Sequence, residues 1–220
     1  QKKMNSLNYE EFSDHDFKPN SLIVLLHGIG ADAFDLISLA KHWSLTLKKT
    51  KFYSLQAPYP YRFAPSGRQW FDLEDRDQTR ILKEIELVKP MILTFFKKKL
   101  KDYNLQYKDL ILVGFSQGTM VALNLALTIK EELKGVLGYS GGVILTKSGK
   151  IEINSKPKIC LIHGNEDEVV PKKMMESTEI VLKDSTIDIN THLIKNLGHS
   201  INQEGLEIGQ NFLVKYLLKC

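Results

Sequence analysis

Two short stretches of the chain consist almost entirely of aliphatic residues, at residues 21–26 and 110–113. Runs of this length and composition are typical of strands that are buried on both faces of a mainly parallel sheet. Weaker apolar segments, which are further strand candidates, lie at residues 51–55, 134–139, 158–162 and 189–194. The apolar pattern therefore predicts strands distributed along the whole chain.

Helical periodicity separates these strand candidates. Apolar residues recur at helical spacing in four segments, residues 36–47, 81–96, 174–181 and 208–217. Asp32 is a suitable N-cap for the first helix, Pro171 suits the first turn of the third, and Pro90 should kink or split the second. Strands that alternate with helices predict an α/β fold, in which helices cover both faces of a mostly parallel central sheet.

Residues 56–76 show neither a strand-like apolar run nor helical periodicity. They contain several prolines and five aromatic residues. Loops of this length inside a compact domain are usually functional, and the aromatic content argues against disorder. The sequence contains no internal repeat, linker or low-complexity tract. We therefore expect residues 1–220 to form a single domain, in which residues 1–20 are a polar N-terminal extension of a kind that is often flexible.

The charge balance does not indicate a nucleic-acid partner. The net charge is only +4, and the lysines are spread along the chain. The densest run, Lys97 to Lys99 with Lys101, falls where a helix should end, and we interpret it as a solvated helix end. Transient contact with an anionic membrane surface is the less favoured alternative.

Cysteine usage and hydropathy favour a cytoplasmic location. The two cysteines, Cys160 and Cys220, provide no disulfide framework, and Cys160 lies within a predicted buried strand. No apolar run approaches the roughly 18 residues of a membrane span, and the first twenty residues contain no signal-peptide core. Because the chain starts with Gln1, earlier removal of a leader stays open.

The sharpest chemical motif is Gly-Phe-Ser-Gln-Gly at residues 114–118, between a predicted buried strand and a helical stretch. In a nucleophile elbow, a strained strand-to-helix turn projects the serine hydroxyl above the sheet. This context predicts that Ser116 is a nucleophile and that the backbone N–H of Gln117 points toward a developing oxyanion. The alternative is an ordinary glycine turn.

An acid and a histidine follow Ser116 in the order that α/β hydrolases use. Asp167 comes directly after the strand candidate 158–162, with Glu166 and Glu168 as rival acids. His199 lies between the last strand candidate and the last helix. Because the carboxyl ends of parallel strands share one sheet edge, these groups are expected to meet there as a catalytic triad.

Two other histidines, His27 and His163, each precede a glycine at a predicted strand end. They precede the acid along the chain, so we interpret them as structural. The glycine-rich turn that follows His27 makes the N–H of Ile29 the candidate second oxyanion donor. Residues 14–16, Asp-His-Asp, resemble a metal-binding fragment, but a polar terminus is the better interpretation; no metal or other cofactor is predicted.

These motifs together resemble the bacterial phospholipase/carboxylesterase family, which is similar to acyl-protein thioesterases and belongs to the α/β-hydrolase superfamily. The matching segments are residues 26–32, 70–72, 114–118, 163–171 and 198–206. The resemblance implies the α/β-hydrolase fold and the roles given above for Ser116, Asp167 and His199, with the amides of Ile29 and Gln117 as oxyanion hole. After Asp32 the chain departs from the family pattern with Ala-Phe.

The resemblance implies hydrolysis of carboxylic esters of short to medium acyl chains, of lysophospholipids or of acyl-protein thioesters. An α/β-hydrolase peptidase or lactonase, or a catalytically silent acyl- or lipid-binding protein, are the alternatives. Phe63, Trp70 and Phe71 are the predicted substrate contacts in the aromatic loop; a loop packed only on itself is the other possibility. The sequence leaves the oligomeric state open, and a homodimer is one of the alternatives.

Overall fold

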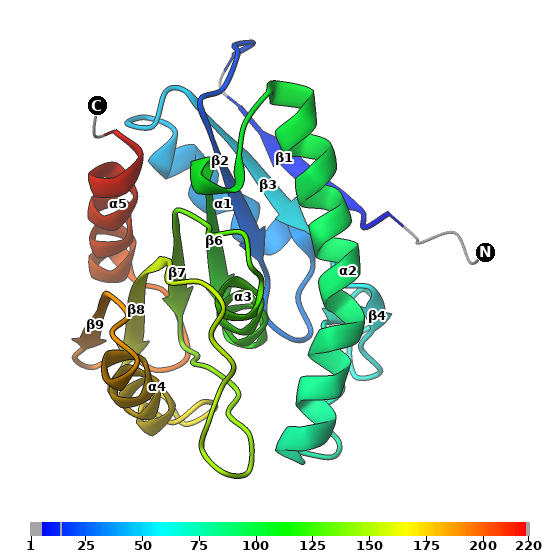
Figure 1. Ribbon diagram of the computed structural model, residues 1–220, viewed down its shortest axis with the longest axis vertical. Coiled ribbons are helices and arrows are strands. Elements are labelled where there is room, and N and C mark those ends of the chain that lie inside the picture. The colour runs from blue at the N-terminus through cyan, green and yellow to red at the C-terminus, as the bar shows by residue number, and fades with distance from the viewer. Residues whose placement is uncertain (1–5, 14, 219–220) are drawn as a thin grey trace.

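A computed structural model describes residues 6–13 and 15–218 of the protein. Its centre is a seven-stranded sheet with the order β1-β3-β2-β6-β7-β8-β9, in which only the β1–β3 pair is antiparallel (Figure 1). The strands are β1 (Tyr9–Phe12), β2 (Ser21–Leu26), β3 (Thr50–Leu55), β6 (Leu110–Phe115), β7 (Gly135–Tyr139), β8 (Lys158–Gly164) and β9 (Ile189–Ile194). The predicted α/β class and mostly parallel sheet are confirmed.

Five α-helices and one short 3₁₀ helix accompany the sheet in the described residues. They are α1 (Ala33–Trp43), α2 (Gln78–Tyr103), η1 (Tyr107–Asp109), α3 (Gln117–Thr128), α4 (Lys173–Asp184) and α5 (Gln203–Leu217). The α-helices pack into two separate hydrophobic cores. Helices α2, α3 and α4 contribute to one core, and α1 and α5 contribute to the other (Figure 1). Strand β2 alternates between these cores, with Leu22 and Val24 in the first and Ile23 and Leu25 in the second. Burial on both faces explains its continuous aliphatic run.

The N-terminal segment contributes to the sheet. Strand β1 pairs with β3 in antiparallel register, and Leu7 just before it is buried. Part of the predicted N-terminal extension therefore belongs to the sheet, and its strand is too short and polar to stand out in the apolar pattern. Asp14 of the suspected metal fragment lies outside the described residues.

Three features of the helices bear on what the sequence predicts. Helix α1 ends at Trp43, and Leu47, which the periodicity placed on it, is buried in the turn that follows. Helix α2 continues through Pro90 without being split. Of the lysine run near its end, Lys99 is buried, so the expectation of a wholly solvated run is wrong at this residue.

No described helix is long and apolar enough to cross a membrane. Residues 6–13 and 15–218 also contain no group of three or more histidine, cysteine or acidic side chains that could hold a metal ion.

Candidate active site

Ser116 occupies a strained turn between β6 and α3. Its φ of 54° and ψ of −117° lie outside the regions that non-glycine residues prefer. The glycine on the helix side is required by packing, because a Cβ on Gly118 would lie 1.9 Å from the carbonyl oxygen of Leu26. The backbone N–H of Ser116 donates to Tyr139 O at 2.9 Å. The end of β6, the start of α3 and the neighbouring strands thus hold the turn in the geometry of a nucleophile elbow.

Asp167 and His199, predicted from distant parts of the sequence, are in contact. The Nδ1 of His199 lies 2.7 Å from Oδ2 of Asp167, and because a carboxylate only accepts, the imidazole is the donor. The other oxygen, Oδ1, accepts from the backbone N–H groups of Val169 and Val170 at 2.9 and 2.8 Å. Asp167 is buried, whereas Glu166 and Glu168 are exposed.

The imidazole of His199 also packs beside the elbow. Its ring centroid lies 4.9 Å from that of Phe115, the residue directly before Ser116. At the carboxyl ends of β6, β8 and β9, the structure thus places Asp167 and His199 in contact, and His199 beside the residue that precedes Ser116.

His163 supplies a second imidazole contact to the same acid. Its side chain is fully buried, and Nε2 lies 2.7 Å from Val170 O and 3.3 Å from Asp167 Oδ2. Because both neighbours are acceptors, Nε2 carries the proton, and Nδ1 has no partner in the described structure. The sequence predicted a structural role for His163 but not this contact.

His27 is held in the neutral form. Its Nε2 accepts the N–H of Ala57 at 3.1 Å, while Nδ1 donates to Gly28 O at 2.7 Å. Burial lowers the pKa of His27 below its usual value. With both ring nitrogens engaged by backbone groups, His27 acts as a support beneath the glycine-rich turn.

That turn, which contains Ile29, is braced by the aromatic loop. Gly30 has a φ of 82° and donates its N–H to Arg68 O at 2.8 Å. The N–H of Arg68 in turn donates to Ala31 O at 2.8 Å. Gln117, the other candidate oxyanion donor, is the first residue of α3, where a backbone N–H has no acceptor inside the helix.

The side chain of Gln117 clamps the aromatic loop. Its Oε1 accepts the N–H of Trp70 at 2.7 Å, and its Nε2 donates to Phe71 O at 2.7 Å. The indole N–H of Trp70 donates to His27 O at 2.8 Å. Sequence reasoning assigned Gln117 only a backbone role, because nothing local links it to a loop 47 residues away.

The three predicted substrate contacts occupy different environments. Trp70 and Phe71 are 0% exposed, whereas Phe63 is 69% exposed. Phe63 lines a cavity of about 550 Å³, together with apolar side chains that include Ile29, Tyr61, Leu73 and Val169. Trp70 and Phe71 are not among its lining residues. Trp70 and Phe71 therefore do not form the wall of this cavity.

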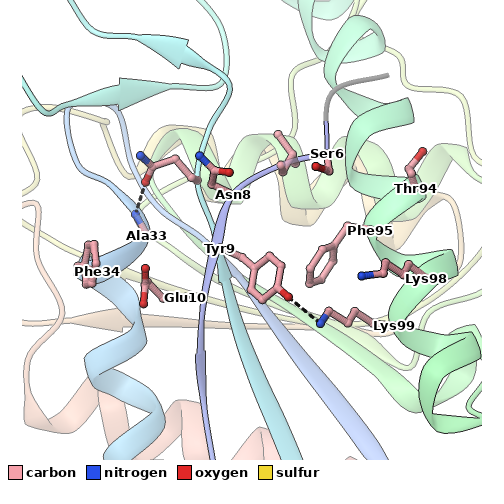
Figure 2. Close-up of a pocket in the computed structure, with 12 residues that line it drawn as sticks. Ser6, Asn8, Tyr9, Glu10, Ala33, Phe34, Thr94, Phe95, Lys98 and Lys99 are labelled. Atoms are coloured by element: carbon pink, nitrogen blue, oxygen red, sulfur yellow. Dashed lines mark hydrogen bonds between the residues drawn. The ribbon is translucent and has the colours of Figure 1, made fainter. Parts of the chain in front are cut away.

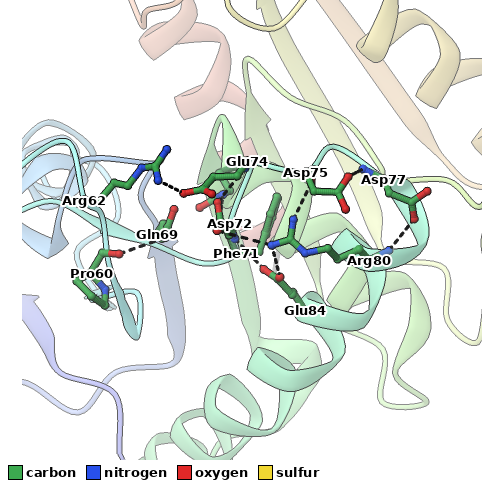
Figure 3. A network of polar contacts seen from close by, with 11 residues as sticks. Pro60, Arg62, Gln69, Phe71, Asp72, Glu74, Asp75, Asp77, Arg80 and Glu84 are labelled. Atoms are coloured by element: carbon green, nitrogen blue, oxygen red, sulfur yellow. Dashed lines mark hydrogen bonds and ion pairs between the residues drawn. The ribbon is translucent and has the colours of Figure 1, made fainter.

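A polar network fixes the loop around this cavity (Figure 3). Arg62 forms an ion pair with Glu74, and both line the cavity. Near the start of α2, Arg80 pairs with Glu84 at 2.8 Å, and Glu84 accepts the N–H of Asp72 at 2.7 Å. Exposed ion pairs contribute little to stability, so we interpret the network mainly as a positional constraint on residues 72–84.

Comparison with solved structures first defines the class of protein. The crystal structure of esterase PE8 superposes with a TM-score of 0.90 and 36% sequence identity, covering 97% of this chain and 100% of that one. SOBER1 of Arabidopsis thaliana gives a TM-score of 0.75 at 22% identity, covering 90% and 99% of the two chains. The fold is that of an α/β-hydrolase esterase, as the sequence predicted.

The family follows from the sequence itself, since residues 7–217 match the Phospholipase/Carboxylesterase family. The chain belongs to this family of carboxylesterase- and acyl-protein-thioesterase-like hydrolases. Acyl-protein thioesterase 1 of Emericella nidulans is 26% identical, over 89% of this chain and 90% of the relative. Esterase YpfH of Escherichia coli is 21% identical, over 90% and 84%.

Proposed function

We propose that this protein hydrolyses carboxylic esters through a Ser116-His199-Asp167 triad and an acyl-enzyme intermediate. The observation that carries the proposal is the 2.7 Å contact between His199 Nδ1 and Asp167 Oδ2 beside a serine in the strained elbow conformation. Donation from Nδ1 to the carboxylate leaves Nε2 without a proton. This is the tautomer that a general base needs.

In the acylation step, Nε2 of His199 accepts the Ser116 proton as the hydroxyl oxygen attacks the ester carbonyl carbon. Asp167 stabilises the imidazolium that forms, and its four contacts hold the carboxylate in place. The imidazolium then protonates the leaving alcohol as the ester C–O bond breaks, which gives the acyl-enzyme.

In the deacylation step, the same imidazole accepts a proton from water as the water oxygen attacks the acyl carbon. The carboxylic acid leaves, and the proton returns to the oxygen of Ser116. The N–H groups of Ile29 and Gln117 are the proposed oxyanion donors in both steps. The turn that contains Ile29 is held by backbone hydrogen bonds between Arg68 and its neighbours Gly30 and Ala31, which supports a preorganised hole.

We expect the cavity beside Ile29 to bind acyl chains of short to medium length. Its volume of about 550 Å³ is within the range of small-ligand pockets, and exposed Phe63 and Val169 offer apolar contact. Lysophospholipids and acyl-protein thioesters are further substrates of the same chemistry. A peptidase or lactonase would keep the triad and use the cavity differently.

The deciding experiment is Ser116→Ala with p-nitrophenyl butyrate as substrate and a fluorophosphonate probe for the activated serine. We expect normal folding, no labelling and a loss of several powers of ten in kcat, because only binding and the oxyanion hole would remain. Ser148→Ala, at an exposed serine, is the matched control and should keep both activities.

Retention of hydrolysis and labelling in Ser116→Ala would overturn the triad. A wild-type protein that takes no label and hydrolyses no ester would instead favour the silent acyl-binding alternative.

A further inference from the structure

A second cavity lies away from the triad, between the N-terminal segment, the first turn of α1 and the C-terminal half of α2 (Figure 2). Its volume is about 520 Å³. Its lining includes six residues with charged or aromatic side chains: Tyr9, Glu10, Phe34, Phe95, Lys98 and Lys99. Ser116, Asp167 and His199 do not line it.

Lys99 brings a positive charge into the wall of this cavity. The residue is only 6% exposed, and its Nζ donates to the hydroxyl oxygen of Tyr9 at 2.9 Å (Figure 2). The ammonium also lies 4.5 Å from the ring centroid of Tyr9 and 4.6 Å from that of Tyr53. These aromatic faces stabilise the cation without neutralising it.

The charge of Lys99 is not balanced by a carboxylate. Within residues 6–13 and 15–218, no acidic side chain lies within ion-pair distance of Lys99 or of its exposed neighbour Lys98. Buried charges in proteins are usually paired. Two adjacent lysines without an acid therefore favour an anion in the cavity.

A hydrogen-bond donor is available beside the two lysines. The oxygen of Tyr9 accepts from Lys99, so its own O–H hydrogen can be donated elsewhere, and the described residues provide no other partner for it. Phe95 and the exposed ring of Phe34 add apolar surface. Glu10 on the α1 side disfavours a second negative group on the ligand (Figure 2).

We propose that this cavity binds an amphiphilic anion, namely a carboxylate or phosphate head group on a short apolar chain. Tyr9, Lys98 and Lys99 bind the head group, and the apolar chain lies against Phe34 and Phe95. Free carboxylic acids and phosphate monoesters share this chemistry. Binding here does not require the proposed triad.

Isothermal titration calorimetry with octanoate, octyl phosphate and neutral 1-octanol tests the site on the full chain. We expect the wild type to bind at least one anion more tightly than octanol. Tyr9→Phe and Lys98→Gln should each weaken the bound anion on the order of tenfold, as expected for loss of a hydrogen bond to a charged group. Lys97→Gln, at an exposed lysine one residue before Lys98, is the matched control and should bind like the wild type.

The preferred anion identifies the head group that the site selects. Equal affinity for octanol and both anions would overturn the proposal, as would unchanged binding in Tyr9→Phe and Lys98→Gln. Binding that is lost in Phe63→Ala but kept in Tyr9→Phe would place the ligand in the cavity beside Ile29 and would also overturn it. Because Tyr9→Phe removes a single oxygen, thermal unfolding should show that this variant folds.

Discussion

Asp167 accepts hydrogen bonds on both carboxylate oxygens, while Glu166 and Glu168 on either side of it are exposed. We predict that Asp167→Asn lowers kcat about 10⁴-fold with little change in fold, because an amide no longer fixes the imidazole tautomer. Glu166→Gln and Glu168→Gln should keep nearly wild-type turnover. Steady-state kinetics on a p-nitrophenyl ester measures all three, and a severe loss in either glutamate variant alone would show that the acid is misassigned.

His27 makes the stability of the protein depend on pH. Burial lowers its pKa below the unfolded value of about 6.5, so the unfolded chain binds more protons in this range. The contribution of neutral His27 to stability is therefore present above about pH 6.5 and decreases as pH falls below that value toward the folded pKa. We predict a steeper loss of Tm on acidification for the wild type than for His27→Gln.

Thermal unfolding between pH 7.5 and 5 checks this difference. Parallel Tm curves for the two proteins would contradict the assignment of His27 as a buried neutral group. The comparison with His27→Gln is needed because other groups titrate over the same range.

Single residues differ in how far the sequence predicts their environment. Ser116, Asp167 and His199 carry recognisable local motifs, and their order along the chain is informative. The Gln117 clamp depends on a loop whose path is set by tertiary contacts. Lys99 follows the charge pattern of its neighbours, yet aromatic rings from other elements enclose it.

At the scale of elements, the close approach of α3 to β2 is the tightest constraint on the site. A Cβ at Gly118 would clash with backbone carbonyls of β2 and the turn after it, and backbone atoms cannot move aside as a flexible side chain can. We predict that Gly118→Ala destabilises the protein by at least about 3 kcal/mol. Urea unfolding measures the change.

Gly198→Ala is the matched control, since the nearest atom to its added Cβ lies 3.8 Å away. It should change the unfolding free energy by less than about 1 kcal/mol. Similar unfolding curves for Gly118→Ala and the wild type would show that α3 can shift away from β2.

The strength of the apolar pattern explains which elements could be predicted. Strands β2 and β6 are buried on both faces and form continuous aliphatic runs. Strand β1 has only partly buried and exposed residues, so its pairing depends on the edge that β3 offers. The short β4 (Tyr59–Pro60) and β5 (Arg68–Gln69) are likewise set by the path of the aromatic loop.

At the scale of the whole molecule, the aromatic loop contains buried residues such as Trp70 and an exposed residue, Phe63, that we propose contacts the substrate. We predict that Phe63→Ala lowers kcat/KM for octanoate esters about tenfold and changes acetate hydrolysis little, because only the longer chain reaches this exposed ring. Trp70→Ala should instead destabilise the fold by about 3–5 kcal/mol, since the indole is fully buried. Ester kinetics over graded chain lengths, together with urea unfolding, separates the two roles.

Equal losses on both esters in Phe63→Ala would contradict the acyl-cavity assignment. A stable Trp70→Ala variant with altered chain-length preference would instead indicate that Trp70 contacts the substrate.

The antiparallel β1 strand also affects how copies of the chain can meet. The outer edge of β3 is paired with β1 (Tyr9–Phe12), so its backbone N–H and C=O groups are hydrogen-bonded there. Without that strand, β3 would present an open edge onto which a strand from another chain could add. At the opposite end of the sheet, β9 exposes Asn190 and Leu193 and partly exposes Thr191 and His192, and the polar side chains among them discourage such addition. Strand β1 thereby becomes the edge strand itself, and its four residues, with Glu10 and Glu11 among them, form a short, charged edge of the kind that resists edge-to-edge aggregation.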